Sequence, residues 1–426
     1  MPTDLSGAYE RVKGMLKARL VDVLTDLPAG GGASLERRGL EEHLHQALKT
    51  LSEESLAPRL PAPDERRLMQ EVIDEVIGLG PLEPLLGDPT VTEVMVNGPR
   101  DLFVERNGSL QRVDARFRDA NHLMTVIERM LGRVGRTVNE AEPICDASLE
   151  DGSRINVIIP PLVLEGPVVT IRRQLREWTM EEYVAGLALS EQAAEFLQAC
   201  VKAKANVVIS GGTSTGKTTL VSILSAFIPP HERIITIENV AELSLRNREH
   251  WIRVVSKAPN LEGRGEIPLR TLVRNALRMR PDRIILGEAR GGEALDVVQA
   301  MHVGHEGVIT VLHANSPQAA LERLETLMLM SGLELPPQAC RMQIASVVDL
   351  VIHMGRFTDG SRRIAAITQV LGASQEGFQL EDLFVFEVEG FSDGGQLRGT
   401  FRYTGARPKF LQKFQLNNVA VPGWMT

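Results

Sequence analysis

The sequence predicts an α/β protein in which a larger domain follows a smaller α+β domain. Residues 207–210, 234–238, 284–286 and 308–312 are short apolar runs separated by helical or loop segments. This pattern is typical of a mainly parallel sheet covered by helices. Ahead of these runs, residues 64–173 combine an amphipathic helix with several short alternating strands, which indicates a separate α+β unit.

Four segments follow from this pattern. Residues 1–63 hold weak helical patches interrupted by a Pro-Ala-Gly-Gly-Gly stretch, and we predict that they form a variable, loosely attached N-terminal extension. The α+β domain covers residues 64–173, and residues 174–186, which have few apolar repeats, form a linker. The larger domain covers residues 187–426 and ends in a β-rich tail.

The elements of the α+β domain are justified in chain order. Between Leu68 and Ile77 apolar residues recur at three- and four-residue spacing, which predicts a helix, and Gly78 ends it. The dipeptide Asn107-Gly108 predicts a hairpin turn between strands. The predicted strands around it lie at 94–96, 102–104, 155–159 and 168–173.

Composition excludes several classes of protein. The chain has 426 residues, of which 43% are hydrophobic and 24% charged, so collagen-like, disordered and coiled-coil structures are poor explanations. It carries 47 Lys or Arg against 55 Asp or Glu, a net charge of −8, which gives no general attraction to nucleic acid or anionic lipid. Residues 246–290, however, hold 11 Lys or Arg against 5 Asp or Glu, a local basic excess.

Cysteine usage and hydropathy favour a cytoplasmic location. Cys145, Cys200 and Cys340 lie far apart without a C-x-x-C pair, which argues against a disulfide framework or a thiolate zinc site. No run reaches the ~18 apolar residues of a membrane span, and the N-terminus does not resemble a signal peptide. We therefore expect any membrane association to be peripheral.

The strongest motif is a phosphate loop. The pattern G-x-x-x-x-G-K-[ST] is matched by Gly211, Gly212, Thr213, Ser214, Thr215, Gly216, Lys217 and Thr218. An apolar strand precedes it and an apolar helix beginning near Thr219 follows it, as the motif requires. We also expect Thr219 to contact the nucleotide. Such a loop turns backbone N–H groups toward a polyanion; Lys217 would contact phosphate oxygens and Thr218 would bind Mg²⁺. The alternative is a glycine-rich turn that matches by chance.

Two glutamates follow predicted strands. Glu238 ends the run 234–238, and Glu288 follows 284–286, so both carboxylates are expected at the carboxyl edge of the sheet beside the phosphate loop. Hydrolysis of ATP needs an acidic group for the metal and one to orient water there. The alternative for each glutamate is a solvated strand end.

Histidines and arginines complete the candidate site. His305 and His313 flank the strand 308–312, and each either contacts a γ-phosphate, relays between sites or has a structural role. Arg172 and Arg173 end the last strand of the α+β domain, next to the linker, and would reach nucleotide on another subunit or remain surface charges.

A second set of arginines recurs every four residues. We predict that Arg270, Arg274 and Arg278 line one edge of a helix whose other side is apolar. This edge is either solvated or used for a subunit interface or a phosphate contact.

Longer stretches resemble the ATPases of type II and type IV secretion and pilus machines. They are SGGTSTGKTT, TIENVAEL, RNALRMRPDRIILGEARGGEALDVVQAMHVGHEG and TVLHANSPQAALERLE. Within that superfamily the chain is most similar to the CpaF-type ATPases of Tad/Flp pilus assembly. The stretches that resemble this branch are GLGPLEPLLGDPTVTEVMVNGP, DGSRINVIIPPL, VVTIRRQ and the tail LEDLFVF…YTGARPKFL.

The resemblance implies a RecA-like ATPase domain, flexibly joined to the N-terminal domain, in a homohexamer that works with inner-membrane platform proteins. It implies ATP and Mg²⁺ as ligands, and we expect no binding to nucleic acid. Lys217 and Thr218 would belong to Walker A, Glu238 to the Asp box and Glu288 to Walker B. His305 and His313 would form the His box, and Arg172 and Arg173 would match the basic phosphate contacts. Either glutamate is a candidate general base.

One position departs from the family pattern. The residue that is usually aspartate in the Asp box is Asn239, which brings no charge, so the metal role of this box is in doubt.

Other functions remain as alternatives. One is a RecA-like nucleic-acid translocase, which the few Trp and Tyr residues disfavour. Another is a nucleotide-binding ring protein that does not hydrolyse ATP. Within the superfamily, the alternative is a type IV secretion ATPase or a pilus retraction motor.

Overall fold

A computed structural model of the protein describes residues 5–25, 37–54, 62–106, 108–149, 151–173, 178–245, 249–257, 259 and 264–425. The chain forms two compact units, Met1–Leu175 and Arg176–Thr426. Asn107, the first residue of the predicted hairpin turn, lies outside the described residues.

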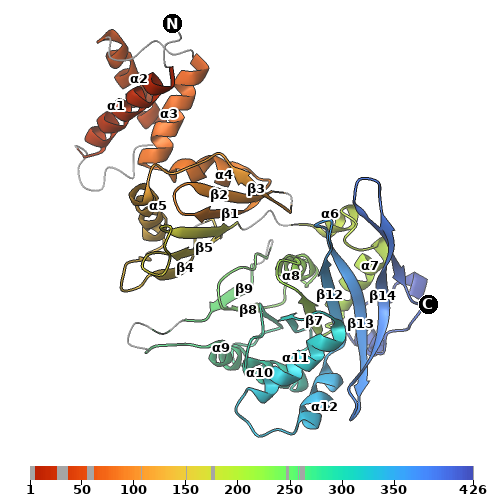
Figure 1. Ribbon diagram of the computed structural model, residues 1–426. Coiled ribbons are helices and arrows are strands. Elements are labelled where there is room, and N and C mark those ends of the chain that lie inside the picture. Colours follow the sequence, from red (N-terminus) through yellow and green to blue (C-terminus); the bar gives the residue numbers. More distant parts are fainter. Residues whose placement is uncertain are drawn as a thin grey trace. The chain divides into compact units, whose positions relative to one another are not determined.

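Unit 1 begins with three helices, α1 (Leu5–Thr25), α2 (Arg37–Glu53) and α3 (Ala62–Val76), which lie side by side in Figure 1. Each contributes one stripe of apolar residues to a shared core. The buried members of this core are Val12, Leu16, Leu20, Leu40, Leu44, Leu48, Leu51, Leu68, Val72 and Ile73. The segment predicted as a loosely attached extension therefore contains two helices that pack against the predicted helix α3.

The second part of unit 1 is a sheet with a helix packed on it. Its strands are β1 (Val91–Asn97), β2 (Asp101–Arg106), β3 (Ser109–Val113), β4 (Ile144–Ser148), β5 (Arg154–Ile158) and β6 (Val168–Arg172). They pair antiparallel in the order β3-β2-β1-β6-β5-β4. Alternate strand residues such as Val94 and Val104 pack against buried residues of α5 (Ala120–Arg133). Short helices η1 (Gly80–Leu82) and α4 (Glu83–Gly87) precede β1.

Two arginines of α5 bond to the end of α3. Arg129 donates hydrogen bonds to the carbonyl oxygens of Gly78 and Glu75, and Arg133 donates to Ile77 O at 3.1 Å. The last carbonyls of a helix have no partner within the helix, so cationic donors stabilise them. These bonds connect the helical part of unit 1 to its sheet.

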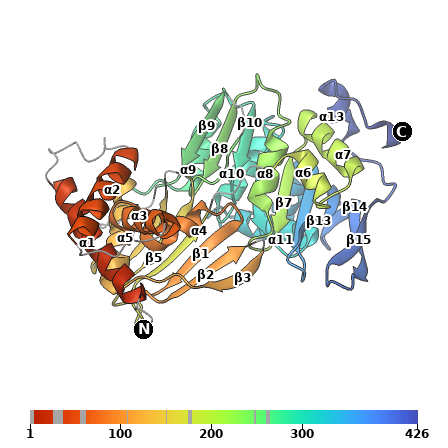
Figure 2. The ribbon, with the colours of Figure 1, turned by 90° about the horizontal axis from the view of Figure 1, so that it is seen from above.

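Unit 2 contains a nine-stranded sheet in the order β15-β14-β13-β12-β7-β11-β10-β8-β9. The strands from β12 to β9 are parallel, and β12 to β15 pair antiparallel. Figure 2 shows β9 near one edge and β15 near the other. The bounds are β7 (Val207–Gly211), β8 (Ile234–Glu238), β9 (Trp251–Val255), β10 (Arg283–Leu286), β11 (Ile309–His313), β12 (Leu350–Arg356), β13 (Arg362–Ala373), β14 (Phe378–Phe391) and β15 (Leu397–Tyr403).

Helices cover both faces of this sheet. They are α6 (Met180–Ala185), α7 (Glu191–Lys202), α8 (Lys217–Ser225), α9 (Leu269–Ala276), α10 (Glu293–His302), α11 (Pro317–Leu329), α12 (Pro337–Val347), α13 (Leu411–Leu416) and the short helix η2 (Gly423–Met425). Val207 and Ile209 of β7 enter one core with α7 and α8, whereas Val208 enters the other with α10 and α11. This arrangement, visible in Figure 1, confirms the predicted α/β fold class.

One further finding concerns the start of this unit. The described part of the predicted linker contains α6, which begins with a capping box between Thr179 and Glu182 and buries Met180 and Tyr183.

Among the helices of the described residues, none is long and apolar enough to cross a bilayer.

Candidate active site

The predicted phosphate loop joins the central strand β7 to α8. Its backbone requires glycine at both ends, because Gly211 has φ +154° and Gly216 has φ +94°. A Cβ on Gly211 would lie 2.5 Å from the carbonyl oxygen of Met354. Ser214 also adopts positive φ, at +58°. The loop is therefore held in one unusual conformation by its neighbour strand and by its glycines.

Lys217 is the first residue of α8, and it is only 7% exposed. Its Nζ donates hydrogen bonds to the carbonyl oxygens of Gly211, at 3.1 Å, and Gly212, at 2.6 Å. Thr215 Oγ1 also donates to Gly212 O, at 3.0 Å. The ammonium group thus lies inside the curve of the loop, next to the N-terminus of a helix, where anions are favoured.

The register of the sheet brings two more strands to the loop. His313, the last residue of β11, pairs with Gly211, and Met354 of β12 pairs with Gly211 from the other side. One residue earlier, Ser210 Oγ and His353 Nδ1 are 2.9 Å apart. Burial and then the positive charge of Lys217 lower the pKa of His353. The carboxyl ends of three parallel strands therefore meet at the loop.

Glu238 is the last residue of β8 and is 3% exposed. Its Oε1 accepts hydrogen bonds from the backbone N–H groups of Glu242, at 2.9 Å, and Leu243, at 2.8 Å. Its Oε2 is buried and has no hydrogen-bond partner among the described residues. Burial raises the pKa of Glu238 even though the two N–H donors oppose this. One carboxylate oxygen is thus fixed and the other remains available as an acceptor.

Glu288 follows β10 and forms a small polar network. Its Oε2 accepts a hydrogen bond from Arg290 at 2.7 Å, and its Oε1 lies 3.3 Å from His313 Nε2. Burial and the charge of Lys217 lower the pKa of His313, although Glu288 acts in the opposite direction. His313 is therefore a neutral group near pH 7 that links Glu288 to the edge of the phosphate loop.

Asn239, the departure from the Asp box, has a local structural partner. Its Oδ1 accepts a hydrogen bond from Ser256 Oγ at 3.0 Å, while Ser256 N donates to Glu238 O at 2.9 Å. These contacts connect the loop after β8 to the end of β9. The amide side chain is therefore bonded to the residue that follows β9.

His305 lies apart from His313. It belongs to the turn between α10 and β11, where its N–H donates to Ala300 O at 3.1 Å. His313 ends β11, and a five-residue strand is roughly 13 Å long. The two histidines therefore lie at opposite ends of one strand within the chain, and only His313 is beside the phosphate loop.

The end of α9 separates Arg278 from Arg270 and Arg274, which lie on the helix. Arg270 and Arg274 donate hydrogen bonds to the two carboxylate oxygens of Asp296 on α10, at 2.8 and 2.7 Å. Arg278 does not lie on the helix as predicted, because α9 ends at Ala276. The chain then turns toward Pro281. The first two arginines thus bind a neighbouring helix.

Arg172 and Arg173 belong to unit 1. Arg172 Nε lies 3.6 Å from Glu93 Oε1, and its side chain is 49% exposed. Arg173 donates hydrogen bonds to the carbonyl oxygens of Asp88 and Val91, the latter at 3.1 Å. Arg172 is thus the more accessible of the two guanidinium groups.

Two groups near the loop were not found from the sequence. Arg290 follows Glu288 by two residues, and its position in GEAR gave a local signal. His353 interrupts the apolar strand β12, and a histidine in such a strand was the available signal. Its meaning depended on knowing that β12 pairs with β7.

The candidate donors suit a magnesium nucleotide. Mg²⁺ prefers oxygen ligands and usually takes several from water and substrate phosphates. The Thr218 hydroxyl, next to Lys217 on α8, and the orphaned Oε2 of Glu238 are oxygen donors of this kind. In the described part of the chain, no cluster of three or more His, Cys, Asp or Glu side chains could hold a metal by itself.

The comparisons with known proteins decide the family. The model of the family described as "Type II/IV secretion system protein" matches residues 75–375. The chain belongs to this family. With its phosphate loop, this membership makes it a P-loop ATP hydrolase. The matched region runs from the end of α3 to β13 and so includes every candidate residue of the site.

Individual relatives agree with this family. The putative conjugal transfer protein MT3759 of Mycobacterium tuberculosis is 36% identical over 301 residues, which cover 69% of this chain and 84% of that protein. The type IV secretion system protein VirB11 of Brucella suis is 34% identical over 304 residues, which cover 65% of this chain and 84% of VirB11. The crystal structure of the Brucella suis VirB11 ATPase with sulphate has a TM-score of 0.38 at 31% identity, covering 67% of this chain and 91% of that one.

Proposed function

We propose that this protein is the cytoplasmic motor ATPase of a Tad/Flp-type pilus machine. The observation that supports hydrolysis is the meeting of Lys217, Glu288 and His313 at the carboxyl edge of one parallel sheet. The pilus branch is supported by the resemblance of this chain to CpaF-type ATPases. The segments that carry the resemblance are the run from η1 to β1, the strands β5 and β6, and the C-terminal tail. The motor acts as a homohexamer on inner-membrane platform proteins, and it reaches the membrane through them.

Binding of ATP uses the loop and the start of α8. The β- and γ-phosphates occupy the concave side of residues 211–218, where the Lys217 ammonium exchanges its two carbonyl acceptors for phosphate oxygens. The N–H groups of the first turn of α8 face the same anions. Thr218, with Glu288 or Glu238, would hold Mg²⁺, which would neutralise phosphate charge.

Hydrolysis needs a group that orients the attacking water. Glu238 offers an oxygen without a partner in the described chain, and Glu288 offers a carboxylate positioned by Arg290 and His313. Either glutamate accepts the water's proton. Arg172 then supplies a positive charge to the phosphates when the N-terminal domain closes, whereas Arg173 would first lose its bonds to backbone carbonyls. Closure and reopening drive the platform.

A second candidate is a type IV secretion ATPase. The names of the relatives favour it, because they include a conjugal transfer protein and VirB11. A pilus retraction motor belongs to the same group of alternatives. These functions share the chemistry of the site and differ in the machine that uses it.

Genetic complementation distinguishes the machines. The gene is deleted in its host, and surface pili are counted by electron microscopy with the wild-type gene, Lys217→Ala or the matched surface control Arg136→Ser. We expect wild type and the control to restore pili and Lys217→Ala to fail. Normal piliation of the deletion strain, together with loss of conjugal transfer or effector secretion, would favour the second candidate instead.

A further inference from the structure

Unit 1 contains a large groove that the ATPase site does not use. Its volume is about 1050 Å³, and it lies between α1 and the segment that follows β3, next to the first turn of α5. The cationic side chains along it are Lys13, Lys17, Arg100, Arg112, Arg116 and Arg118. Two carboxylates, Glu75 and Asp114, share the lining. Six cationic and two anionic side chains of the described residues thus line the groove.

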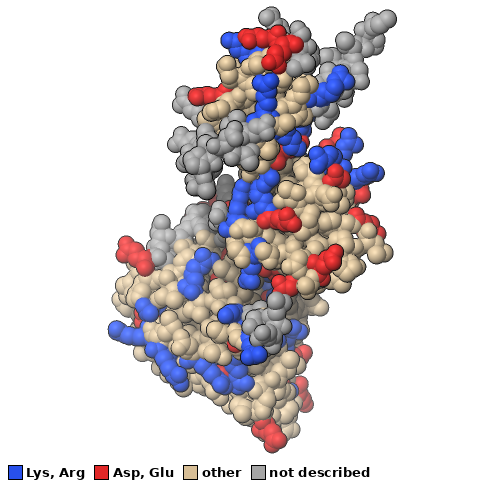
Figure 3. Space-filling model, turned by 90° about the vertical axis from the view of Figure 1, so that its left-hand side faces the viewer, with Lys and Arg blue, Asp and Glu red and all other residues tan. Residues whose placement is uncertain are grey.

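This charge contrasts with the rest of the unit. Residues 1–175 carry 21 Lys or Arg against 28 Asp or Glu, so the unit as a whole is acidic. On the face shown in Figure 3, basic and acidic side chains are interspersed on the surface. Six cations around one groove are thus a local concentration that the composition does not explain. Ion pairs with neighbouring carboxylates offset the charge of Lys13, Lys17, Arg112 and Arg118, so Arg100 and Arg116 supply the charge that an anionic ligand would meet.

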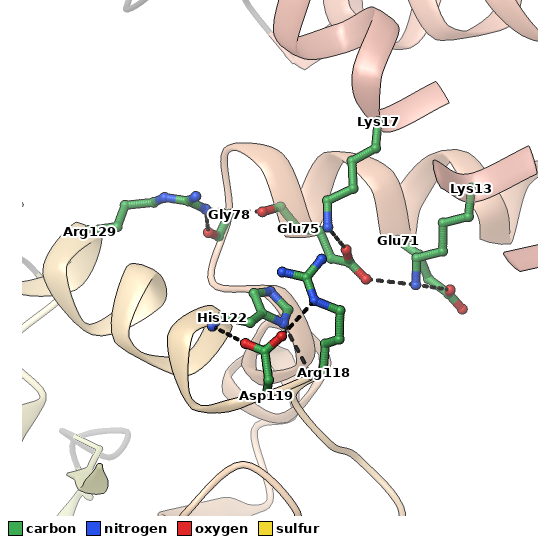
Figure 4. A network of polar contacts seen from close by, with 9 residues as sticks. All are labelled: Lys13, Lys17, Glu71, Glu75, Gly78, Arg118, Asp119, His122 and Arg129. Atoms are coloured by element: carbon green, nitrogen blue, oxygen red, sulfur yellow. Dashed lines mark hydrogen bonds and ion pairs between the residues drawn. The ribbon is translucent and has the colours of Figure 1, made fainter. Parts of the chain in front are cut away.

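Internal ion pairs hold several of these cations in place. Lys13 bonds to Glu71 at 2.9 Å and to Glu75 at 2.8 Å, and Lys17 bonds to Glu75 as well. Hydrogen bonds to Glu75 and Glu71 raise the pKa of Lys13, although burial acts against them. Figure 4 shows the Arg118 side chain and the His122 ring on the side of α3 that carries the Lys17–Glu75 pair. The wall formed by α1 is therefore charged and ordered.

Two of the arginines have no such partner. Arg100, in the turn between β1 and β2, and Arg116, after β3, are exposed, and neither forms an ion pair or hydrogen bond with a described residue. Arg112, in contrast, bonds to Asp101, and Arg118 Nε bonds to Asp119 at 3.0 Å. Arg100 and Arg116 are thus the groove's available guanidinium groups.

His122 adds an unsatisfied donor. Its Nδ1 accepts a hydrogen bond from Arg118 N at 3.3 Å, so the ring proton lies on Nε2. Nε2 is buried and has no hydrogen-bond partner among the described residues. Burial lowers the pKa of His122, which keeps the ring neutral near pH 7. A buried N–H group without a partner is uncommon in proteins, and one beside a basic groove suits an anion or its bound water.

Gly14 gives the groove part of its width. It lies within α1 between Lys13 and Lys17, although glycine is unfavourable inside a helix. A Cβ at this position would meet nothing within 4 Å. A larger side chain could therefore be placed here without a clash in the protein, and it would extend into the groove.

We propose that this groove binds a ligand that carries several phosphate groups. A guanidinium group donates two parallel hydrogen bonds to phosphate, and each phosphate monoester brings a charge of about −1.5 to −2. The volume exceeds what one inorganic phosphate fills and lies at the upper end of small-molecule sites. Phe117 is only 1% exposed, so a peptide would find no aromatic anchor in the groove. The source is a soluble polyphosphorylated compound or a phospholipid headgroup.

Titration calorimetry of the full chain at physiological salt tests this site. Every protein carries Lys217→Ala, so that the phosphate loop contributes little to binding. The probes are tripolyphosphate and vesicles that contain cardiolipin, a phospholipid whose headgroup carries more than one phosphate. We expect at least one of them to bind, and Arg100→Ser with Arg116→Ser to weaken that binding about ten-fold or more. Binding of tripolyphosphate assigns a soluble ligand, whereas binding of vesicles alone assigns a headgroup.

Two control variants distinguish binding in the groove from general electrostatic attraction to the protein surface. Lys49→Ser with Arg136→Ser removes the same charge from exposed positions outside the groove and should leave affinity within two-fold. Gly14→Gln changes no charge and should weaken binding by occupying space. Equal losses in the two double variants, an unaffected Gly14→Gln, or no binding of either probe would overturn the proposal. Equally tight binding of a poly-glutamate peptide would also overturn it, in favour of an acidic protein partner.

Discussion

Replacing Glu238 by glutamine should stabilise unit 2 while slowing ATP hydrolysis. The substitution keeps a side-chain oxygen for the N–H groups of Glu242 and Leu243, at 2.9 and 2.8 Å. It removes a charge from Oε2, which is buried without a partner in the described chain. Glu238→Gln therefore separates the structural cost of this carboxylate from its chemical use.

The magnitude follows from the burial of that oxygen. An unsatisfied buried polar group costs about 1–3 kcal/mol, and more when it is charged. The glutamine amide remains partly unsatisfied, so we expect a net gain of about 1 kcal/mol. In a unit of this size that gain raises Tm by about 2–4 °C. If Glu238 orients or deprotonates water, turnover should fall by about 10²–10⁴.

The pH dependence of the Tm difference provides an internal check. Because the folded-state pKa of Glu238 is raised, the group favours folding below its unfolded pKa, and this contribution is lost as pH rises through the folded pKa. The wild type therefore carries the penalty of a buried charge at pH values above its folded-state pKa. The Tm advantage of Glu238→Gln should shrink as pH falls through that pKa toward the ordinary value of 4.5.

Differential scanning calorimetry and phosphate release measure the two effects. Glu288→Gln is the matched control, because Glu288 is partly exposed and bonded to Arg290 and His313. It should bind ATP and turn over slowly without the gain in Tm. A lower Tm for Glu238→Gln, or turnover equal to wild type, would refute the reasoning about Glu238.

Three further predictions concern the framework of unit 2. Gly211→Ala places a Cβ 2.5 Å from the Met354 carbonyl oxygen, so it should cost about 1–3 kcal/mol and abolish nucleotide binding, as equilibrium dialysis would report. Glu232→Gln leaves Arg283, 1% exposed, without its charged partner and should lower the free energy of unfolding in urea by about 3–5 kcal/mol. Asn206→Ala removes bonds of 2.9 and 3.0 Å to backbone groups before β12 and β11 and should cost about 1–3 kcal/mol by the same measurement. An unchanged unfolding midpoint would contradict either of the last two.

The sequence predicted those parts of the site that depend on local pattern. The phosphate loop is a contiguous motif, and Glu238 and Glu288 follow apolar runs that are the strands β8 and β10. Because parallel strands end at one edge, their shared location could be inferred without knowing the strand order. The α/β class followed from the same alternation.

Parts that depend on long-range pairing were not predicted. His353 became part of the site because β12 pairs with β7, some 143 residues earlier in the chain. Arg270 and Arg274 were placed on a helix, but their partner Asp296 belongs to α10. The prediction also placed Arg278 on this helix, which was wrong, because α9 ends at Ala276 and the residues before Pro281 do not continue it.

The N-terminal helices show a different cause. The apolar residues Leu40, Leu44, Leu48 and Leu51 recur at helical spacing, but the Pro-Ala-Gly-Gly-Gly stretch before them is typical of a linker. Short amphipathic helices obtain most of their stability from packing, which a single sequence shows weakly. The groove between α1 and β3 could not be predicted from the sequence either, because it depends on how α1 packs next to the sheet.

The most direct test of this account is Mg²⁺-dependent release of phosphate from ATP by the purified full-length chain, measured beside Lys217→Ala. The account predicts release by the wild type that disappears when Mg²⁺ is chelated and that is lost in Lys217→Ala, with both proteins folded. Wild-type release in the Lys217→Ala protein, or nucleotide binding by the wild type without any release, would contradict it.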